Sequence, residues 1–250
     1  MLKIDEKSNR YIKLVEDRQH CRLCSPEMKN PFEIYDIDGT WLEPREADTW
    51  ALWQNSLKAN ILLIGQEWGD LKGFKQSHGK SSISSETNRN LIKLFKQIGV
   101  DVASPESGIK NNTLFFTNAA LCLKIVDENT KGNKGAQGKT NPIWYHNCEP
   151  LIIRLIQIIE PRIIIPIGTE AYNSLAEIFH LPIHKSGKFS KIIDKTPHGF
   201  NVIVNGYEAK IFPVYHPSRR VINMAKYGMG RSWDDMLADW GRIKSLLATL

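Results

Sequence analysis

The 250-residue sequence contains little cysteine and lacks any long hydrophobic run. Its first residues, Met1 to Lys7, include no apolar segment of the kind that a secretory signal needs. The most apolar stretch, residues 151–168, is interrupted by charged and polar side chains, so it falls short of the ~20 apolar residues of a membrane-spanning helix. We therefore expect a soluble, cytoplasmic protein with no membrane partner.

Because thiols stay reduced in the cytoplasm, the four cysteines are a poor disulfide framework. They are therefore either buried core residues or metal ligands. Cys21 and Cys24 form a Cys-x-x-Cys pair, which can place two sulfurs on one metal centre. Zinc ribbons add a second close pair, whereas Cys122 and Cys148 are scattered along the chain. An iron–sulfur cluster is a larger object and accepts scattered thiolates.

The composition is that of a folded protein, with 42% hydrophobic and 24% charged residues. The net charge of 33 − 27 = +6 permits a nucleic-acid partner without requiring one. We expect a single monomeric domain over residues 1–250, with a Cys-x-x-Cys segment at about 11–45 and an inserted loop at 127–142. This Gly-, Lys- and Asn-rich loop predicts a solvated insertion; the alternative is phosphate contact through Lys131, Lys134 and Lys139.

Short, continuously apolar segments predict strands buried on both faces, as in a parallel sheet. They cover residues 60–65, 113–118, 162–168 and 210–215. Helical patterns flank them at residues 47–58, 87–98, 149–159, 169–179 and 232–248, where Thr87 and Ser232 are candidate N-caps and Thr169 is the start of its helix. The fold class expected is α/β, a three-layer α/β/α sandwich with a four-stranded parallel sheet.

Two glycine-rich stretches come close to a phosphate-binding loop. One begins at Gly73 and the other at Gly132. Both have five residues between the glycines where the motif has four, and neither directly follows a predicted strand. We therefore expect no nucleotide cofactor.

Three chemically distinct side chains follow the predicted strands. Glu67, Asn118 and His216 would meet at the carboxyl edge of the sheet, where such folds bind ligands. A carboxylate can stabilise positive charge on a sugar and position water. An imidazole can stabilise an anionic leaving base, and an amide can read a pyrimidine edge. Singly, each side chain has a structural explanation; together they favour cleavage of a bond between a sugar and a base.

These segments resemble the uracil-DNA glycosylase superfamily, in particular its iron–sulfur branch, family four. The resemblance covers roughly residues 20–245. It is carried by Gly65-Gln66-Glu67-Trp68-Gly69, by Asn118 in Thr-Asn-x-x-x-Cys, by residues 161–171, by His216-Pro217-Ser218 and by the order of the four cysteines.

The resemblance implies monofunctional excision of a flipped base from DNA, as in DNA repair, leaving an abasic site. It implies a structural [4Fe–4S] cluster held by Cys21, Cys24, Cys122 and Cys148. Glu67 and His216 would be catalytic. Gly65 and Gln66 would bind a carbonyl of the base through the backbone, and Asn118 would read its edge.

Departures from the family pattern leave the substrate open. The branch usually has Gly-Glu-Ala-Pro-Gly at this motif, whereas Gln66-Glu67 is closer to the Gln-Asp of the main uracil enzymes with a longer acid, and Trp68 replaces a proline. Phe74 is the candidate for stacking on the base, with Trp68 as the alternative. Uracil is the default substrate; another or bulky modified pyrimidine, as in viral DNA with an antiviral role, is the alternative. A catalytically silent DNA-binding relative and a zinc-containing phosphate-binding enzyme are further hypotheses.

Basic residues follow the His-Pro-Ser motif. Ser218, Arg219 and Arg220 are expected to bind DNA, and one of the arginines would fill the space of the flipped base. Lys226 and Arg231 extend this basic stretch. The alternative is an ordinary solvated basic surface.

Overall fold

The structure is a computed structural model. It describes residues 2–38, 53–68, 71, 74–75, 81–125, 141–186, 188–228 and 230–247, without the side chains of residues 2–5 and 35–38. Lys131, Lys134 and Lys139, with nearly all of the loop predicted at 127–142, lie outside the described residues.

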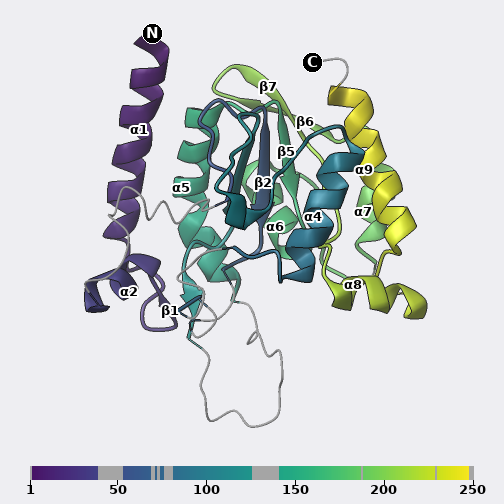
Figure 1. The fold of residues 1–250 in the computed structure, drawn as a ribbon, viewed down its shortest axis with the longest axis horizontal. Helices are drawn as coiled ribbons and strands as arrows, with labels where there is room; N and C mark the ends of the chain where they lie inside the picture. Colours follow the sequence, from purple (N-terminus) through teal and green to yellow (C-terminus); the bar gives the residue numbers. More distant parts are fainter. Residues whose placement is uncertain are drawn as a thin grey trace.

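A mixed five-stranded sheet forms the centre of the protein (Figure 1). Its strand order is β3 (Leu114–Asn118), β2 (Ile61–Gly65), β5 (Ile163–Pro166), β7 (Tyr207–Ile211) and β6 (Phe200–Val204). The first four strands run parallel, and the side chains of β2 and β5 are buried throughout. The continuous apolarity of these strands thus reflects burial on both faces, and the predicted α/β class is confirmed.

The fifth strand, β6, was not predicted. It pairs antiparallel with β7 in a hairpin whose turn is Asn205-Gly206, both residues having positive φ. Asn-Gly at the centre of a two-residue hairpin turn is a strong sequence signal for this arrangement. The strand predicted at 210–215 is displaced accordingly: β7 ends at Ile211, and the chain beyond it continues alongside β5 through a single bridge between Val214 and Ile167.

Helices cover both faces of the sheet (Figure 1). On one side α1 packs against α5, and on the other α4 packs against α9. The longer helices are α1 (Leu2–Gln19), α2 (Pro31–Asp38), α4 (Glu86–Gln97), α5 (Pro142–Ile159), α6 (Thr169–Ile178) and α9 (Trp233–Leu247). The shorter ones are α7 (Ser190–Lys195), α8 (Arg219–Met224), η1 (Pro105–Ser107) and η2 (Ala225–Tyr227). No described helix is both long and apolar enough to cross a membrane.

Aromatic contacts join the α4–α9 layer to the sheet. Phe95 of α4 lies edge-to-face with Trp240 of α9, with ring centroids 5.0 Å apart. The same ring stacks on Phe116 of β3 at 5.4 Å. Such pairs add about 0.5–1.5 kcal/mol each beyond the burial of apolar area. The apolar stripes predicted for these two helices therefore do face the core.

One predicted helix is wrong over the part that the structure describes. The part of residues 47–58 that the structure describes, 53–58, is not helical. Asn55 forms a β-bridge with Phe115, and the backbone N–H of Phe116 donates to Gln54 O at 2.8 Å. The prediction placed Trp50 and Trp53 on one helix, whereas Trp53 packs edge-to-face on Phe116. Pairing with the open edge of β3 decides the local conformation.

Helix starts differ from the prediction in two places. α4 begins at Glu86, so Thr87 is not its cap. α5 begins seven residues earlier than predicted, at Pro142, with the side chain of Asn141 accepting from the Ile143 N–H. Ser232 does cap α9, because its Oγ accepts from the Asp235 N–H while Asp235 binds back to Ser232.

Candidate active site

The carboxyl ends of β2 and β3 are locked together. Gly65 and Asn118 are paired in register, and the Ala119 N–H donates to Gly65 O at 2.8 Å. The Ala120 N–H donates to Gln66 O at 2.9 Å, which continues the pairing beyond the last strand residues. The segment expected to bind the base through its backbone therefore lies directly beside the amide expected to read its edge.

Gly65 makes room for the Asn118 side chain. A Cβ atom added at Gly65 would lie 2.4 Å from Asn118 Oδ1, far inside van der Waals contact. The nearest backbone atom, Thr117 O, would be 3.6 Å away, so only the amide has to move. A glycine is therefore needed here to keep the Asn118 amide in its present position.

If Asn118 reads a base edge, as the sequence resemblance implies, the substitution Gly65→Ala should impair that recognition more than it impairs folding. We expect excision to fall by about 10- to 100-fold, the scale of one misplaced pocket contact. The free energy of unfolding should fall by about 1 kcal/mol, since only a side-chain end must shift. The control is Gly241→Ala on α9, where an added Cβ meets nothing within 4 Å. Equal excision by both variants would contradict this placement of Asn118.

Glu67 forms a buried ion pair just beyond β2. Its Oε1 lies 2.7 Å from Lys124 Nζ, and the two side chains are only 1% and 4% exposed. Lys124 belongs to the short strand β4 (Leu123–Lys124). Burial raises the pKa of the Glu67 carboxyl, the neighbouring Lys124 ammonium opposes that rise, and Glu170 adds to it. The sequence analysis identified Glu67 but assigned nothing to Lys124.

His216 follows β7 and lies next to the start of α6. Gly168, with φ of 93°, precedes that helix, and its N–H donates to Val214 O at 2.8 Å. A Cβ at Gly168 would be 3.5 Å from His216 Cβ, so the two segments are in contact. Burial lowers the pKa of the His216 imidazole. The side chain is therefore a neutral imidazole near neutral pH.

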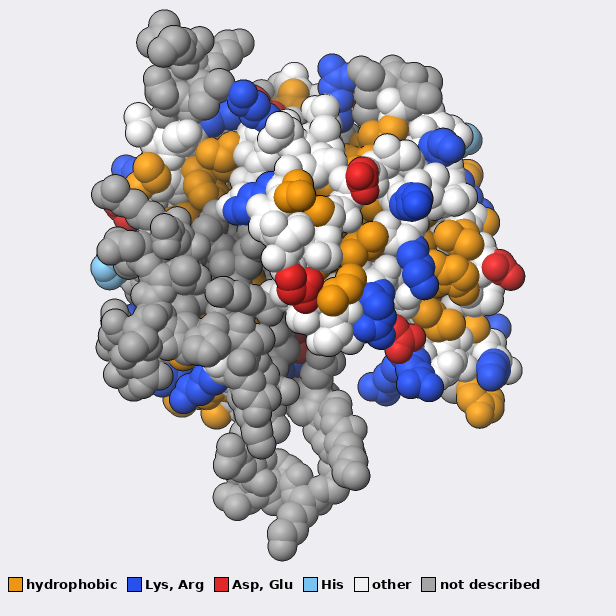
Figure 2. Space-filling view, viewed as in Figure 1, with side chains coloured by type: hydrophobic (Ala, Val, Ile, Leu, Met, Phe, Trp, Pro, Cys, Tyr) orange, Lys and Arg blue, Asp and Glu red, His pale blue; other side chains and the backbone are white. Residues whose placement is uncertain are grey.

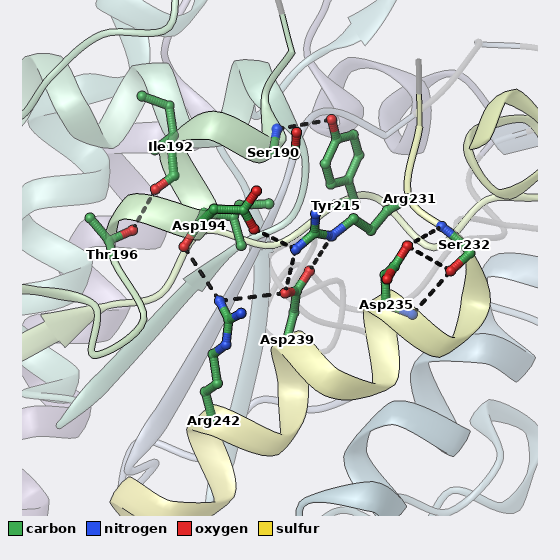
Figure 3. Close-up of polar contacts among 11 residues, drawn as sticks. Ser190, Ile192, Asp194, Thr196, Tyr215, Arg231, Ser232, Asp235, Asp239 and Arg242 are labelled. Carbon is green, nitrogen blue, oxygen red and sulfur yellow. Dashed lines mark hydrogen bonds and ion pairs between the residues drawn. The ribbon is translucent and has the colours of Figure 1, made fainter. Parts of the chain in front are cut away.

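The turn around His216 is held from two sides. Asn90, a buried residue of α4, donates from Nδ2 to Pro217 O at 2.9 Å. On the other side, the Ser190 N–H donates to the hydroxyl of Tyr215 at 3.0 Å (Figure 3). These contacts fix the backbone on both sides of the imidazole, as a site that must hold its geometry requires.

Arg231, which the sequence places in the basic stretch after the His-Pro-Ser motif, is part of an internal ion-pair network. Its guanidinium binds both carboxylate oxygens of Asp239 at 2.9 Å and Asp194 Oδ1 at 2.7 Å (Figure 3). Arg242 also approaches Asp239, at 3.6 Å. The network joins α7 to α9 immediately after the α8–η2 segment. The sequence around Arg231 does not indicate that its acidic partners lie on α7 and α9.

The two candidate stacking aromatics contact each other. Trp68 and Phe74 lie edge-to-face with ring centroids 6.1 Å apart. Phe74 is only 3% exposed, whereas Trp68 is partly buried. The assignment of either ring to the base stays a prediction.

A basic surface surrounds α8. Ser218 caps this helix by accepting from the Val221 N–H, and the exposed Arg219 and Arg220 form its first turn. Lys226 and Tyr227 of η2 are also exposed, Tyr227 at 77%. Figure 2 shows Lys and Arg side chains gathered at the end of the molecule that carries α8. Tyr227 was missed by the sequence analysis; an aromatic beside arginines is suited to contact nucleic acid.

The four cysteines come together from three segments. The strand β1 (Met28–Lys29) pairs with β4, which brings the Cys21–Cys24 turn beside the segment of Cys122. The Leu121 N–H lies 3.5 Å from the sulfur of Cys148 on α5. Burial raises the pKa of Cys122 to about 12 and that of Cys148 to about 11, and the other thiols contribute to both increases. Among the described residues, however, no three His, Cys, Asp or Glu side chains are arranged to hold a metal ion.

A buried arginine accompanies these thiols. Arg18 is 1% exposed, and its Nη2 donates to Leu121 O at 2.6 Å. Its positive charge acts to lower the pKa values of both Cys122 and Cys148. The donor set, four thiols with an adjacent buried cation, is suited to a centre that carries negative charge once its thiols have ionised.

The fold is an α/β sandwich, and Glu67, Asn118 and His216 form a polar site at the carboxyl ends of its parallel strands. A sequence profile of the Uracil DNA glycosylase superfamily matches residues 54–239. The chain belongs to that superfamily, which confirms the resemblance seen in its motifs. It is similar to the Type-4 uracil-DNA glycosylase of Saccharolobus solfataricus, at 22% identity over 170 residues. The match covers 68% of this chain and 66% of that protein, so the chain spans just under two thirds of that relative's length.

Proposed function

We propose that the protein is a monofunctional DNA glycosylase that hydrolyses the N-glycosidic bond of a flipped pyrimidine, with uracil as the default base. The observation that carries this proposal is the buried Glu67 carboxylate beyond β2, on the same sheet edge as Asn118 and His216. Membership of the superfamily supports it.

Glu67 would act on the sugar and on water. As the bond from C1′ to the base nitrogen breaks, positive charge develops on the sugar, and an ionised carboxylate stabilises it. The same carboxylate accepts a proton from the water whose oxygen forms the new bond to C1′. The base takes the electrons of the broken bond and leaves as an anion, which is then protonated.

Asn118 and His216 would act on the base. The Asn118 amide offers one donor and one acceptor to a pyrimidine edge. A neutral His216 donates an N–H toward a carbonyl of the leaving base, where negative charge develops. Because burial lowers the pKa of His216, this donor does not carry a positive charge at neutral pH.

DNA would be held by the α8 surface. Arg219 and Arg220 present cations beside the His-Pro-Ser turn, and such side chains neutralise backbone phosphates. Extrusion of the base leaves a gap in the stack that one long side chain from this turn can fill.

We further propose that Cys21, Cys24, Cys122 and Cys148 hold a [4Fe–4S] cluster. When bound, this group would cross-link three segments of the chain, and no chemical step is assigned to it. The support is the approach of four thiols from those segments and the buried Arg18 beside two of them.

Iron analysis tests this assignment. Purified protein should contain about four iron and four sulfide per chain. Cys148→Ser should lower the iron content and cost about 4 kcal/mol or more of stability, because a buried ligand is lost. A folded, iron-free preparation, or one that contains zinc instead, would contradict the proposal.

The activity is tested by incubating the protein with oligonucleotides that carry uracil or a series of modified pyrimidines, followed by cleavage at abasic sites. Release of uracil supports the default substrate. Release of a modified base alone would support the proposed hydrolysis of the N-glycosidic bond and replace uracil as the proposed substrate. Binding without release of any base would favour the catalytically silent relative.

A further inference from the structure

A buried lysine lies against the proposed catalytic acid. The 2.7 Å contact joins Lys124 Nζ to Glu67 Oε1, and both side chains are almost fully shielded from solvent. Buried charges persist only where an opposite charge or hydrogen bonds compensate for lost hydration. The Lys124 ammonium therefore favours the ionised form of the Glu67 carboxyl.

Lys124 is itself held in place by neighbouring segments. Met28 of β1 is its partner in the antiparallel ladder, which fixes the backbone. Its ammonium lies 5.4 Å from the centre of the Trp144 ring, and the Trp144 Nε1–H donates to Glu27 Oε2 at 2.9 Å. The segments that carry Cys24, Cys122 and Cys148 thus also fix the position of Lys124.

We propose that Lys124 is a positioning residue of the active site, which holds Glu67 as an oriented carboxylate with Oε1 engaged and Oε2 directed to the attacking water. The proposal rests on the glycosylase function proposed above. Both carboxylate oxygens are buried, and the described part of the chain gives neither a partner with full hydrogen-bond geometry, so the 2.7 Å ion pair of Oε1 with Lys124 is the contact that orients the group.

The charges around Glu67 indicate what loss of Lys124 would do. Burial and Glu170 of α6 both raise the pKa of the Glu67 carboxyl, and Lys124 of β4 opposes them. Without the ammonium, the protonated form of Glu67 is favoured. A protonated carboxyl neither stabilises a sugar cation nor accepts a proton from water.

Lys124→Met removes the charge and keeps the unbranched stem. We expect single-turnover excision below neutral pH to fall by about 100-fold, with part of the loss recovered as pH rises and Glu67 ionises. Lys124→Arg retains a cation, so the fall of its excision rate at low pH should occur near the same pH as in the wild type. The proposal is overturned if the Lys124→Met profile has the wild-type shape, or if Lys124→Arg is no better than Lys124→Met.

A stability cycle tests the pair without any substrate. Denaturation midpoints are compared for Lys124→Met, Glu67→Gln and the double variant. Lys124→Met should lower the midpoint more when Glu67 is present than in the Glu67→Gln background. Lys7→Met, at the partly exposed Lys7–Glu160 pair, is the matched control and should lower the midpoint less than Lys124→Met does, although it also loses a hydrogen bond to Ile159 O. Additive midpoints would overturn the coupling, even if the wild type released no base and the glycosylase proposal failed separately.

Covalent trapping separates positioning from nucleophilic attack. A lysine that attacked C1′ would form an imine that borohydride reduces to a stable protein–DNA adduct. We expect no adduct from the wild type, since the Lys124 ammonium is paired and has no free electron pair. An adduct that disappears in Lys124→Met would overturn the positioning assignment.

Discussion

Glu67→Gln is expected to lower the rate of base excision by about 10²- to 10⁴-fold, the contribution of a positioned acid–base group. Glutamine preserves the size of the side chain, and its amide oxygen can still accept from Lys124. What it loses is the negative charge that stabilises the sugar cation and the capacity to take a proton from water. Single-turnover kinetics on an oligonucleotide substrate measure the effect.

DNA affinity provides the control for this variant. Glu67 is buried beyond β2, so its replacement should leave binding to the exposed α8 surface unchanged. Weaker DNA binding together with a normal excision rate at saturating protein would contradict the assignment. Unchanged excision would remove Glu67 from the mechanism altogether.

His216→Ala is expected to lower excision by about 10²- to 10³-fold, the effect of removing one hydrogen-bond donor from a developing negative charge. Burial lowers the pKa of His216 below its ordinary value of 6.5, so the imidazole is already neutral where a solvent-exposed histidine would titrate. Any titration of His216 in the wild-type rate should therefore fall at a lower pH than that of an exposed histidine. If Glu67 acts as proposed, activity should rise as pH increases through the pKa of its carboxyl, which burial raises.

His198→Ala is the matched control, because His198 is exposed beside a surface cavity lined by Lys210, Phe212 and Arg242. Its excision rate should equal that of the wild type. Equal losses in both histidine variants would indicate a general effect on folding and would contradict a specific action of His216.

The sheet was largely predictable, because its strands are buried on both faces and each reads as an uninterrupted apolar segment. The β6–β7 hairpin was missed although Asn205-Gly206 is a strong signal for a hairpin turn. Buried and more exposed side chains alternate along its strands, so they do not form the continuous apolar segments used to predict the other strands. The described part of the helix predicted at 47–58, residues 53–58, is not helical because of a contact that the local sequence does not show. Its backbone pairs with the open edge of β3 instead.

The site was predictable only where residues follow strands directly. Glu67, Asn118 and His216 occupy such positions, and parallel pairing brings their segments to one edge. Lys124 reaches the site from a different strand, through a contact between residues 57 apart in the chain. Arg231 shows the opposite case, because a basic residue near the motif is neutralised by acids on α7 and α9. Local patterns carry no information about such partners.

The most direct test of the account compares the wild type with Glu67→Gln on oligonucleotides that each carry uracil or one modified pyrimidine. The measurement is free base released and strands cleaved at abasic sites after mild alkali. We predict release by the wild type, a strongly reduced rate for Glu67→Gln, and equal DNA binding by the two. Failure of the wild type to release uracil or any modified pyrimidine, with DNA binding intact, would contradict it.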